Sequence, residues 1–188
     1  MIRNAKDSWG WPARALHWMV ALLAIMTFAL GLWMGEVPSR ADRPYYIAIH
    51  ASLGITLLII LTARLVWALA NTTPAPPSGT PVWQVRAARI THISLYAVTF
   101  IVVLFGWLLV GSMHPPIVPQ AFGFLPVPAP LDVGAYDDFF EEAHELVAYA
   151  LIALASVHAL AALWHHYVMH DDTLRRMLGG NAPNAPRA

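Results

Sequence analysis

The sequence predicts an all-α integral membrane protein in which four helices form an up-down bundle within the lipid bilayer. Of its 188 residues, 58% are hydrophobic and 12% are charged, whereas water-soluble domains carry about 25% charged residues. Four stretches are almost free of charge over the roughly 20 residues that a helix needs to cross a bilayer. The chain has no cysteine and a formal net charge of zero. These numbers disfavour a disulfide scaffold and a nucleic-acid partner.

The first two spans are expected over residues 12–35 and 44–69. Residues 15–35 contain no Asp, Glu, Lys or Arg, and no small-x-small cleavage site follows them. We therefore interpret the first stretch as a span and not as a signal peptide. The second span begins beside Pro44, a residue suited to the first turn of a helix, and carries Arg64 near its far end.

The other two spans are expected over residues 84–113 and 138–168. Pro115 and Pro116 follow the third span, and proline disfavours helix in the residue before it. The fourth span starts at Asp137 and Asp138, whose charges suit a helix N-terminus, and residues 146–170 carry no Asp, Glu, Lys or Arg. The connectors are rich in proline, and the long one after the third span is expected to cover something at the membrane surface. We treat residues 1–188 as a single membrane domain.

Basic residues are divided unequally between the two sides that these spans create. With the N-terminus in the cytoplasm, nine of the eleven Lys and Arg residues lie on that side, and Arg40 and Arg43 lie outside. The positive-inside rule then predicts that both termini are cytoplasmic. Most of the acidic residues fall on the outer side.

Five of the nine histidines lie within or at the ends of the spans: His17, His50, His92, His144 and His158. A single membrane histidine often makes only a hydrogen bond between helices, but an ionisable group inside a membrane is a functional candidate by default. Five such residues in one small chain favour a shared role.

His144 and His158 are fourteen residues apart on the fourth span. Fourteen steps of about 100° end about 40° short of four whole turns, so both rings leave nearly the same face, about 21 Å apart along the axis. This separation predicts two stacked sites, each with a partner from another helix. By depth, His50 is level with His144, while both His17 and His92 are level with His158.

Paired imidazoles in a helical bundle without cysteine are what non-covalent haem b requires. Two histidines that close both axial positions of an iron suit electron transfer. Structural zinc would need four ligands close together, and the sequence has no HExxH motif. Small residues such as Gly31, Gly54, Gly106 and Gly111 leave room for a flat macrocycle or for ordinary helix packing.

Arg14, Arg64 and Arg89 line up at the inner edge, where haem propionates would need cations. The positive-inside rule accounts for the same arginines without any cofactor.

Five blocks of sequence resemble the bacterial cytochrome b561 family of small di-haem membrane proteins. They are residues 14–18 (RALHW), 49–54 (IHASLG), 142–145 (EAHE), 157–158 (VH) and 163–167 (LWHHY). The resemblance implies that His50 and His144 bind the outer haem b and that His17 and His158 bind the inner one. It also implies a multi-pass protein of the bacterial inner membrane that exchanges electrons with ubiquinone. His165 matches a position implicated in binding the quinone, and the best-known branch of the family oxidises periplasmic superoxide.

One departure from the family concerns superoxide. An anion is attracted by a positive field, but residues 112–138 contain no Lys or Arg and three Asp residues. Only Arg40 and Arg43 remain to draw an anion toward the outer haem. A cationic or protein electron donor is therefore a more plausible donor than the resemblance alone implies.

Two other functions remain open from the sequence. One is a membrane-anchor subunit that passes electrons to or from a larger hydrogenase or dehydrogenase. The other is a transporter or proton channel with a histidine relay. A stable stoichiometric partner would identify the anchor, and function without haem would identify the channel.

Overall fold

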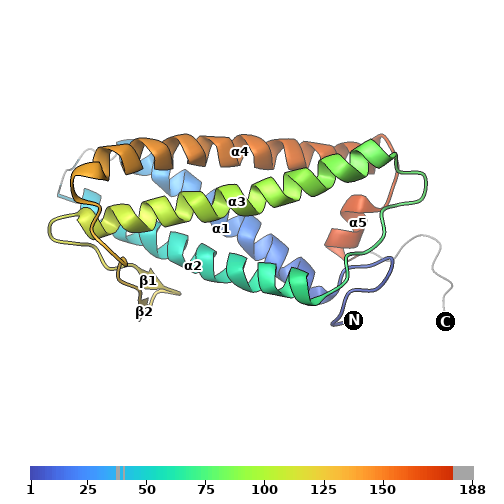
Figure 1. Ribbon diagram of the computed structural model, residues 1–188, viewed down its shortest axis with the longest axis horizontal. Coiled ribbons are helices and arrows are strands. Elements are labelled where there is room, and N and C mark those ends of the chain that lie inside the picture. Colours follow the sequence, from blue (N-terminus) through green and yellow to red (C-terminus); the bar gives the residue numbers. More distant parts are fainter. Residues whose placement is uncertain (37–38, 40, 180–188) are drawn as a thin grey trace.

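A computed structural model describes residues 1–36, 39 and 41–179. Four long helices run along its longest axis: α1 (Trp11–Glu36), α2 (Arg43–Ala70), α3 (Val82–Ser112) and α4 (Asp137–Tyr167) (Figure 1). In the part of the chain that is described, these four helices are long and apolar enough to cross a membrane. The predicted fold class, an integral membrane bundle of four helices, is confirmed.

Local sequence explains where these helices begin and end. Pro44 occupies the first turn of α2, and Pro81 directly precedes α3; at both places the proline lacks only a hydrogen bond that a helix start leaves unmade. Asp137 and Asp138 form the acidic first turn of α4, and His165 and His166 lie in its last turn. The two aspartates match the preference of a helix N-terminus for negative charge.

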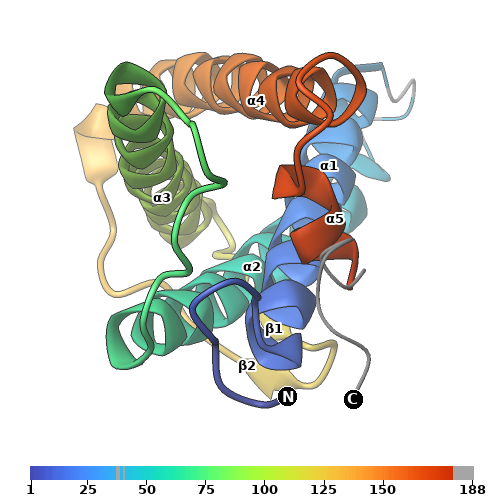
Figure 2. The ribbon, with the colours of Figure 1, turned by 90° about the vertical axis from the view of Figure 1, so that its right-hand side faces the viewer.

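The bundle consists of two helical hairpins. α1 packs along α2, α3 packs along α4, and α2 also contacts α3, whereas α1 and α4 approach each other less closely. Figure 2 looks along the bundle and shows the four tilted helices around a roughly square outline, with α4 at the top, α3 on the left, α2 at the bottom and α1 on the right. Phe28 and Tyr149 meet edge to face between α1 and α4, with ring centroids 5.7 Å apart.

The two ends of the bundle differ. We call the end with the N-terminus and the short helix α5 (Thr173–Leu178) the inner end, after the predicted topology. The outer end is the one with the strands β1 (Gln120–Ala121) and β2 (Leu125–Pro126) and the 3₁₀ helix η1 (Gly134–Tyr136). The indole Nε1–H of Trp18 donates to the Met177 carbonyl at 3.0 Å. The Arg176 guanidinium donates to the Ala75 carbonyl at 2.8 Å. These bonds tie α5 to α1 and to the α2–α3 connector, across the inner end of the square in Figure 2.

The long connector after α3 folds back along α2. β1 and β2 pair antiparallel. The backbone N–H groups of Gln120 and Phe122 donate to the hydroxyls of Ser52 and Thr56, both at 2.9 Å. The connector therefore covers part of α2 near the outer end and satisfies polar backbone groups with side chains of the bundle, as an apolar surrounding requires.

Candidate functional site

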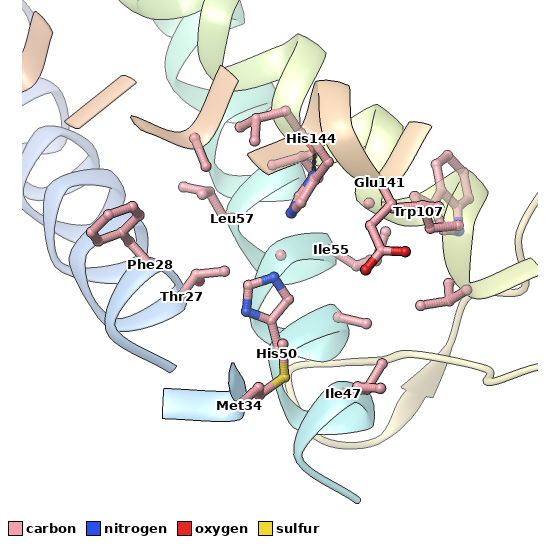
Figure 3. A pocket seen from close by; sticks show the side chains of 18 of the residues that line it. Thr27, Phe28, Met34, Ile47, His50, Ile55, Leu57, Trp107, Glu141 and His144 are labelled. Carbon is pink, nitrogen blue, oxygen red and sulfur yellow. Dashed lines mark hydrogen bonds between the residues drawn. The ribbon is translucent and has the colours of Figure 1, made fainter. Parts of the chain in front are cut away.

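His50 on α2 and His144 on α4 face each other near the outer end. Their ring centroids are 6.0 Å apart and their planes are inclined by 80°. In Figure 3 each ring turns a nitrogen toward the other across the pocket. The Nδ1–H of His144 donates to the Val102 carbonyl oxygen at 2.7 Å, because a carbonyl can only accept. Nε2 is thereby left as the free nitrogen of this ring.

Glycines allow both rings to lie close to neighbouring helices. A Cβ added at Gly106 on α3 would lie 2.7 Å from Cε1 of His144, and one added at Gly31 on α1 would lie 3.2 Å from Cε1 of His50. Gly54, in contrast, has nothing within 4 Å of the added Cβ. Gly54 borders open space in the pocket, whereas Gly31 and Gly106 make room for the imidazoles themselves.

A pocket of about 400 Å³ surrounds the outer pair, and all four long helices line it. Cofactor pockets usually have volumes of roughly 300–1,000 Å³. Apolar side chains such as Phe28, Ile55, Leu57 and Trp107 form most of the wall, and Arg43, Asp137 and Glu141 add charge at its outer edge (Figure 3). The pocket combines an apolar interior with two convergent imidazoles.

The spacing of these imidazoles fits haem iron. Metal–imidazole bonds are about 2.0 Å long, so two nitrogens that bind one iron from opposite sides lie about 4 Å apart. With about 1.1 Å more on each side from nitrogen to ring centre, the two centroids should lie about 6.2 Å apart. The observed 6.0 Å between His50 and His144 agrees with this value.

Three histidines meet toward the inner end. The ring centroids of His17 on α1 and His158 on α4 are 6.2 Å apart, and those of His92 on α3 and His158 are 5.3 Å apart. By the same arithmetic, the pair of His17 and His158 fits a shared iron, and His92 lies too close to His158. The structure thus brings the four predicted ligands together in two pairs, with His92 beside the inner pair.

Arg64 on α2 belongs to this inner cluster. It interacts electrostatically with His17, His92 and His158. Its guanidinium carbon lies 5.4 Å from the ring centre of Tyr96, at cation–π distance. Tyr96 is seven residues beyond Arg89 on α3, about two turns further into the bundle. Arg64 therefore lies deeper than the inner edge at which the sequence places it together with Arg14 and Arg89.

An apolar layer separates the two histidine pairs. Leu151 is buried and lies seven residues from both His144 and His158 on α4, so it occupies the same face halfway between them. It packs in one cluster with buried residues of the other three long helices, namely Val20, Leu57, Leu61, Val102 and Val103. This layer excludes water from the space between the pairs.

His165 lies at the inner end of α4, on the face that carries His158. Its Nδ1 is 2.5 Å from an Asp171 carboxylate oxygen. Of these two residues, only His165 is a candidate from the sequence. The sequence does show that Asp171 comes soon after the expected end of the fourth span. It does not show that the chain turns back there and brings the Asp171 carboxylate to His165.

The arginines proposed to contact anions lie in different surroundings. Arg14 packs against α5, since a Cβ added at Gly179 would collide with its guanidinium. Arg89 is exposed on α3. Arg43 lines the outer pocket, and Arg40 lies outside the described residues. Contacts of these side chains with propionates or with an incoming anion stay predictions.

Comparisons with known proteins agree with this arrangement. A family model described as prokaryotic cytochrome b561 matches residues 8–180. The chain is similar to a protein of Escherichia coli (strain K12) named cytochrome b561 homolog 2, with 38% identity over 180 residues and 94% of each chain covered.

Two further relatives are more distant. The E. coli protein named cytochrome b561 homolog 1 is 30% identical over 166 residues, 87% of this chain and 92% of the relative. A protein of Yersinia pestis named probable superoxide oxidase CybB is 30% identical over 164 residues, 87% of this chain and 91% of the relative. The family model spans nearly the whole chain, and its range contains the positions of all five histidines of the spans; the chain belongs to the prokaryotic cytochrome b561 family of haem b-binding membrane electron-transfer proteins.

Proposed function

We propose that this protein carries electrons across the bacterial inner membrane, between a donor on the periplasmic side and ubiquinone near the cytoplasmic side, by means of two b haems. The observation that supports this most is the spacing of the two imidazole pairs, 6.0 Å at the outer end and 6.2 Å at the inner end. Both pairs fit axial ligation of one iron, and α4 contributes a histidine to each.

In this proposal His50 and His144 hold the outer haem, and His17 and His158 hold the inner haem. When bound, each haem would supply an iron that gains or loses one electron while its two histidines stay in place. The protein fixes the rings: the Val102 carbonyl orients His144, and Gly31 and Gly106 bring α1 and α3 close to the ligand rings. Such fixed surroundings keep the structural change on electron transfer small.

The middle of the bundle insulates the two sites from water. The buried cluster that includes Leu57, Leu61 and Leu151 fills the space between pairs that lie about 21 Å apart along α4. Apolar side chains predominate in this stretch of the axis, and this disfavours proton transfer through it. In our proposal electrons cross this layer and protons are exchanged only at the inner end.

At the inner end we assign His165 to the quinone. It follows His158 by seven residues, which places it on the same face of α4, about 10.5 Å beyond the inner pair. An imidazole at the membrane interface can hydrogen-bond a quinone carbonyl and transfer a proton to it. Both termini and α5 would then lie on the cytoplasmic side, as the distribution of basic residues also favours.

The identity of the electron donor depends on the charges at the outer end. The printed name of the Yersinia pestis relative, probable superoxide oxidase CybB, favours superoxide. Four acidic residues line one hollow at the outer end of α4 and would repel an anionic donor: Asp138, Glu141, Glu142 and Glu145. A hydrogen bond from the Gly134 N–H lowers the pKa of Asp132, which adds another negative charge nearby. We propose a cationic or protein donor as the main partner and superoxide as a slower one.

The haem assignment is tested by combining His50→Ala with His158→Ala. We expect two b haems per wild-type chain, one in each single variant and none in the double variant, measured as the pyridine haemochrome-to-protein ratio. His114→Ala, in the connector after α3, is the matched control and should retain both haems. A wild-type protein without a Soret band, or a double variant with two haems, would contradict the proposal.

A further inference from the structure

The chain folds back at the end of α4 so that Asp171 lies against His165. The Nδ1–H of His165 donates to one carboxylate oxygen of Asp171 at 2.5 Å, and the backbone N–H of Thr173 donates to the other at 2.8 Å. The Asp171 N–H in turn donates to the His165 carbonyl at 3.1 Å. Side chain and backbone thus hold the carboxylate and the imidazole in one orientation.

His170 makes this return possible. Its φ of +53° is in the left-handed region, which residues other than glycine seldom occupy. The Trp164 carbonyl accepts hydrogen bonds from the N–H groups of Val168 and Met169, at 2.9 and 3.2 Å. The turn closes α4 and reverses the chain within a few residues. The contact between His165 and Asp171 is therefore built into the backbone.

Other charged groups lie close in sequence to the pair, but none forms an ion pair with Asp171 in the described part of the chain. Among the described residues, Asp171 forms its ion pair with His165 alone. The nearby cations are engaged elsewhere: Arg176 donates to the Ala75 carbonyl, and Arg14 packs against Gly179. The segment from His165 to Arg176 also carries His166, His170, Asp172 and Arg175.

The carboxylate stays ionised in these surroundings. Partial burial of Asp171 opposes its ionisation, but hydrogen bonds from His165 and Thr173 outweigh this effect and lower the pKa of the carboxyl. Because Nδ1 of His165 is bound, Nε2 is the nitrogen left to meet a ligand, and the side chain is 20% exposed. A histidine with one nitrogen fixed by a carboxylate and the other free has the arrangement of a general acid–base group.

We propose that Asp171 is a positioning residue, which orients His165 so that Nε2 exchanges a proton with the carbonyl oxygen of a bound quinone. This inference rests on the quinone reaction proposed above. Reduction of a quinone to a quinol adds two electrons, which arrive from the outer donor through the protein, and two protons. As one O–H bond forms, the Nε2–H bond of His165 breaks, and the imidazole keeps its Nδ1–H on Asp171. Water at the inner end returns that proton to His165 and supplies the second one.

The test compares Asp171→Asn with Asp172→Asn in the full-length, haem-loaded protein. The reduced protein is mixed anaerobically with decylubiquinone in a stopped-flow instrument, and its haem absorbance is followed from about pH 5.5 to about pH 8.5. We expect Asp171→Asn to slow oxidation by about 100-fold at neutral pH. The deficit should shrink at lower pH, because bulk protons then charge the imidazole without help from the carboxylate. The quinone KM should change little, and Asp172→Asn should match the wild type.

Two further measurements separate positioning from mere packing. The ¹⁵N chemical shifts of the His165 ring should show a protonated Nδ1 in the wild type and a change in its hydrogen bonding in Asp171→Asn. In a His165→Leu background, Asp171→Asn should cause no further loss of rate. An additional loss there, or a deficit in Asp171→Asn that is the same at every pH, would show a packing role and overturn the inference.

The remaining outcomes distinguish this inference from the function on which it rests. If the wild type is oxidised by decylubiquinone and Asp171→Asn reacts equally fast at every pH, the positioning role is wrong and the quinone reaction stands. If the haem-loaded wild type does not react with the quinone at all, both proposals fall.

Discussion

The Nδ1–H of His144 on α4 donates a hydrogen bond of 2.7 Å to the backbone carbonyl oxygen of Val102 on α3. A ring held in this way has a fixed tautomer and presents Nε2 to the outer pocket. Gly106, one turn along from Val102, lies against the same ring. α3 therefore holds the outer imidazole in place although it contributes no predicted ligand at that level.

Replacing Gly106 with alanine should displace His144. The added Cβ would lie 2.7 Å from Cε1 of the ring, and overpacking of this kind costs about 1–3 kcal/mol. We expect Gly106→Ala to lose most of the outer haem and to unfold at a lower temperature, measured by the haem-to-protein ratio and by thermal unfolding. Gly35→Ala, where nothing lies within 4 Å, is the control. Full haem content in Gly106→Ala would contradict this prediction.

His17 and His92 should differ in their effect on the inner haem. Both rings lie near His158, at 6.2 and 5.3 Å between centroids, and only the larger distance leaves room for an iron between the nitrogens. We expect His17→Leu to contain one haem per chain and His92→Leu to contain two, by pyridine haemochrome analysis. The opposite result would assign His92 as the ligand.

Arg64 should raise the reduction potential of the inner haem. It interacts with all three inner histidines and, among the described residues, has no carboxylate partner. A cation about 10 Å away at an effective dielectric constant of about 20 favours the added electron by about 1.7 kcal/mol, on the order of 70 mV.

Spectroelectrochemical titration of Arg64→Gln measures this effect. We expect this variant to lower the reduction potential of one of the two haem transitions. Arg86→Gln, at an exposed position on α3, should leave both potentials unchanged. Two unshifted potentials in Arg64→Gln would show that the charge of Arg64 is screened from the inner haem.

The contact between Asp171 and His165 should stabilise the protein except in strong acid. The pKa of Asp171 is lowered below its ordinary value of 3.8, so the folded state prefers the ionised carboxyl. The stabilisation is therefore fully present above about pH 4 and disappears as the pH falls through the lowered pKa. We expect the wild type to unfold at a higher temperature than Asp171→Asn at pH 7, and the difference to shrink as the pH falls below about 4 and through the lowered pKa of Asp171. A difference that grows in acid would be inconsistent with this contact.

Charge at the outer end should control the choice of donor. The acidic side chains of Asp138, Glu141, Glu142 and Glu145 repel anions and attract cations, and salt screens both effects within a Debye length of about 8–10 Å. Reduction of the haems by superoxide should become faster as ionic strength rises, and reduction by hexaammineruthenium(II) should become slower. The double variant Glu141→Gln/Glu142→Gln should narrow the gap between the two donors. Fast superoxide reduction that declines with salt would instead identify an attractive path, with Arg43 as its candidate.

The fold class could be predicted because it depends on composition and length. Charge-free stretches of membrane length need only to be counted, and the proline and acidic residues at their ends act locally. β1 and β2 escaped prediction because strands of two residues carry no periodic signal. Their position depends on hydroxyl groups of α2, Ser52 and Thr56, that are distant in sequence.

The depth of each candidate histidine along the bundle could be predicted, but the rotation of each helix about its own axis could not. Counting residues along the spans places His50 level with His144 and both His17 and His92 level with His158. Which ring faces His158 at the right distance depends on how each helix turns about its own axis, and packing between helices decides that. Arg64 and Asp171 show the same limit, since a depth within the bundle and a chain reversal at His170 are tertiary features.

The division into two hairpins has a consequence for biogenesis. Each proposed pair joins α4 to the α1–α2 hairpin, and α1 and α4 otherwise approach each other only loosely. The cofactors would then link the α1–α2 hairpin to the α3–α4 hairpin after the two have inserted separately. Without haem, the α3–α4 hairpin would be held mainly by the contact of α3 with α2. The surfaces of α1 and α4 that face each other would then be accessible to membrane proteases. The supply of haem would thus determine what fraction of newly made chains escapes degradation.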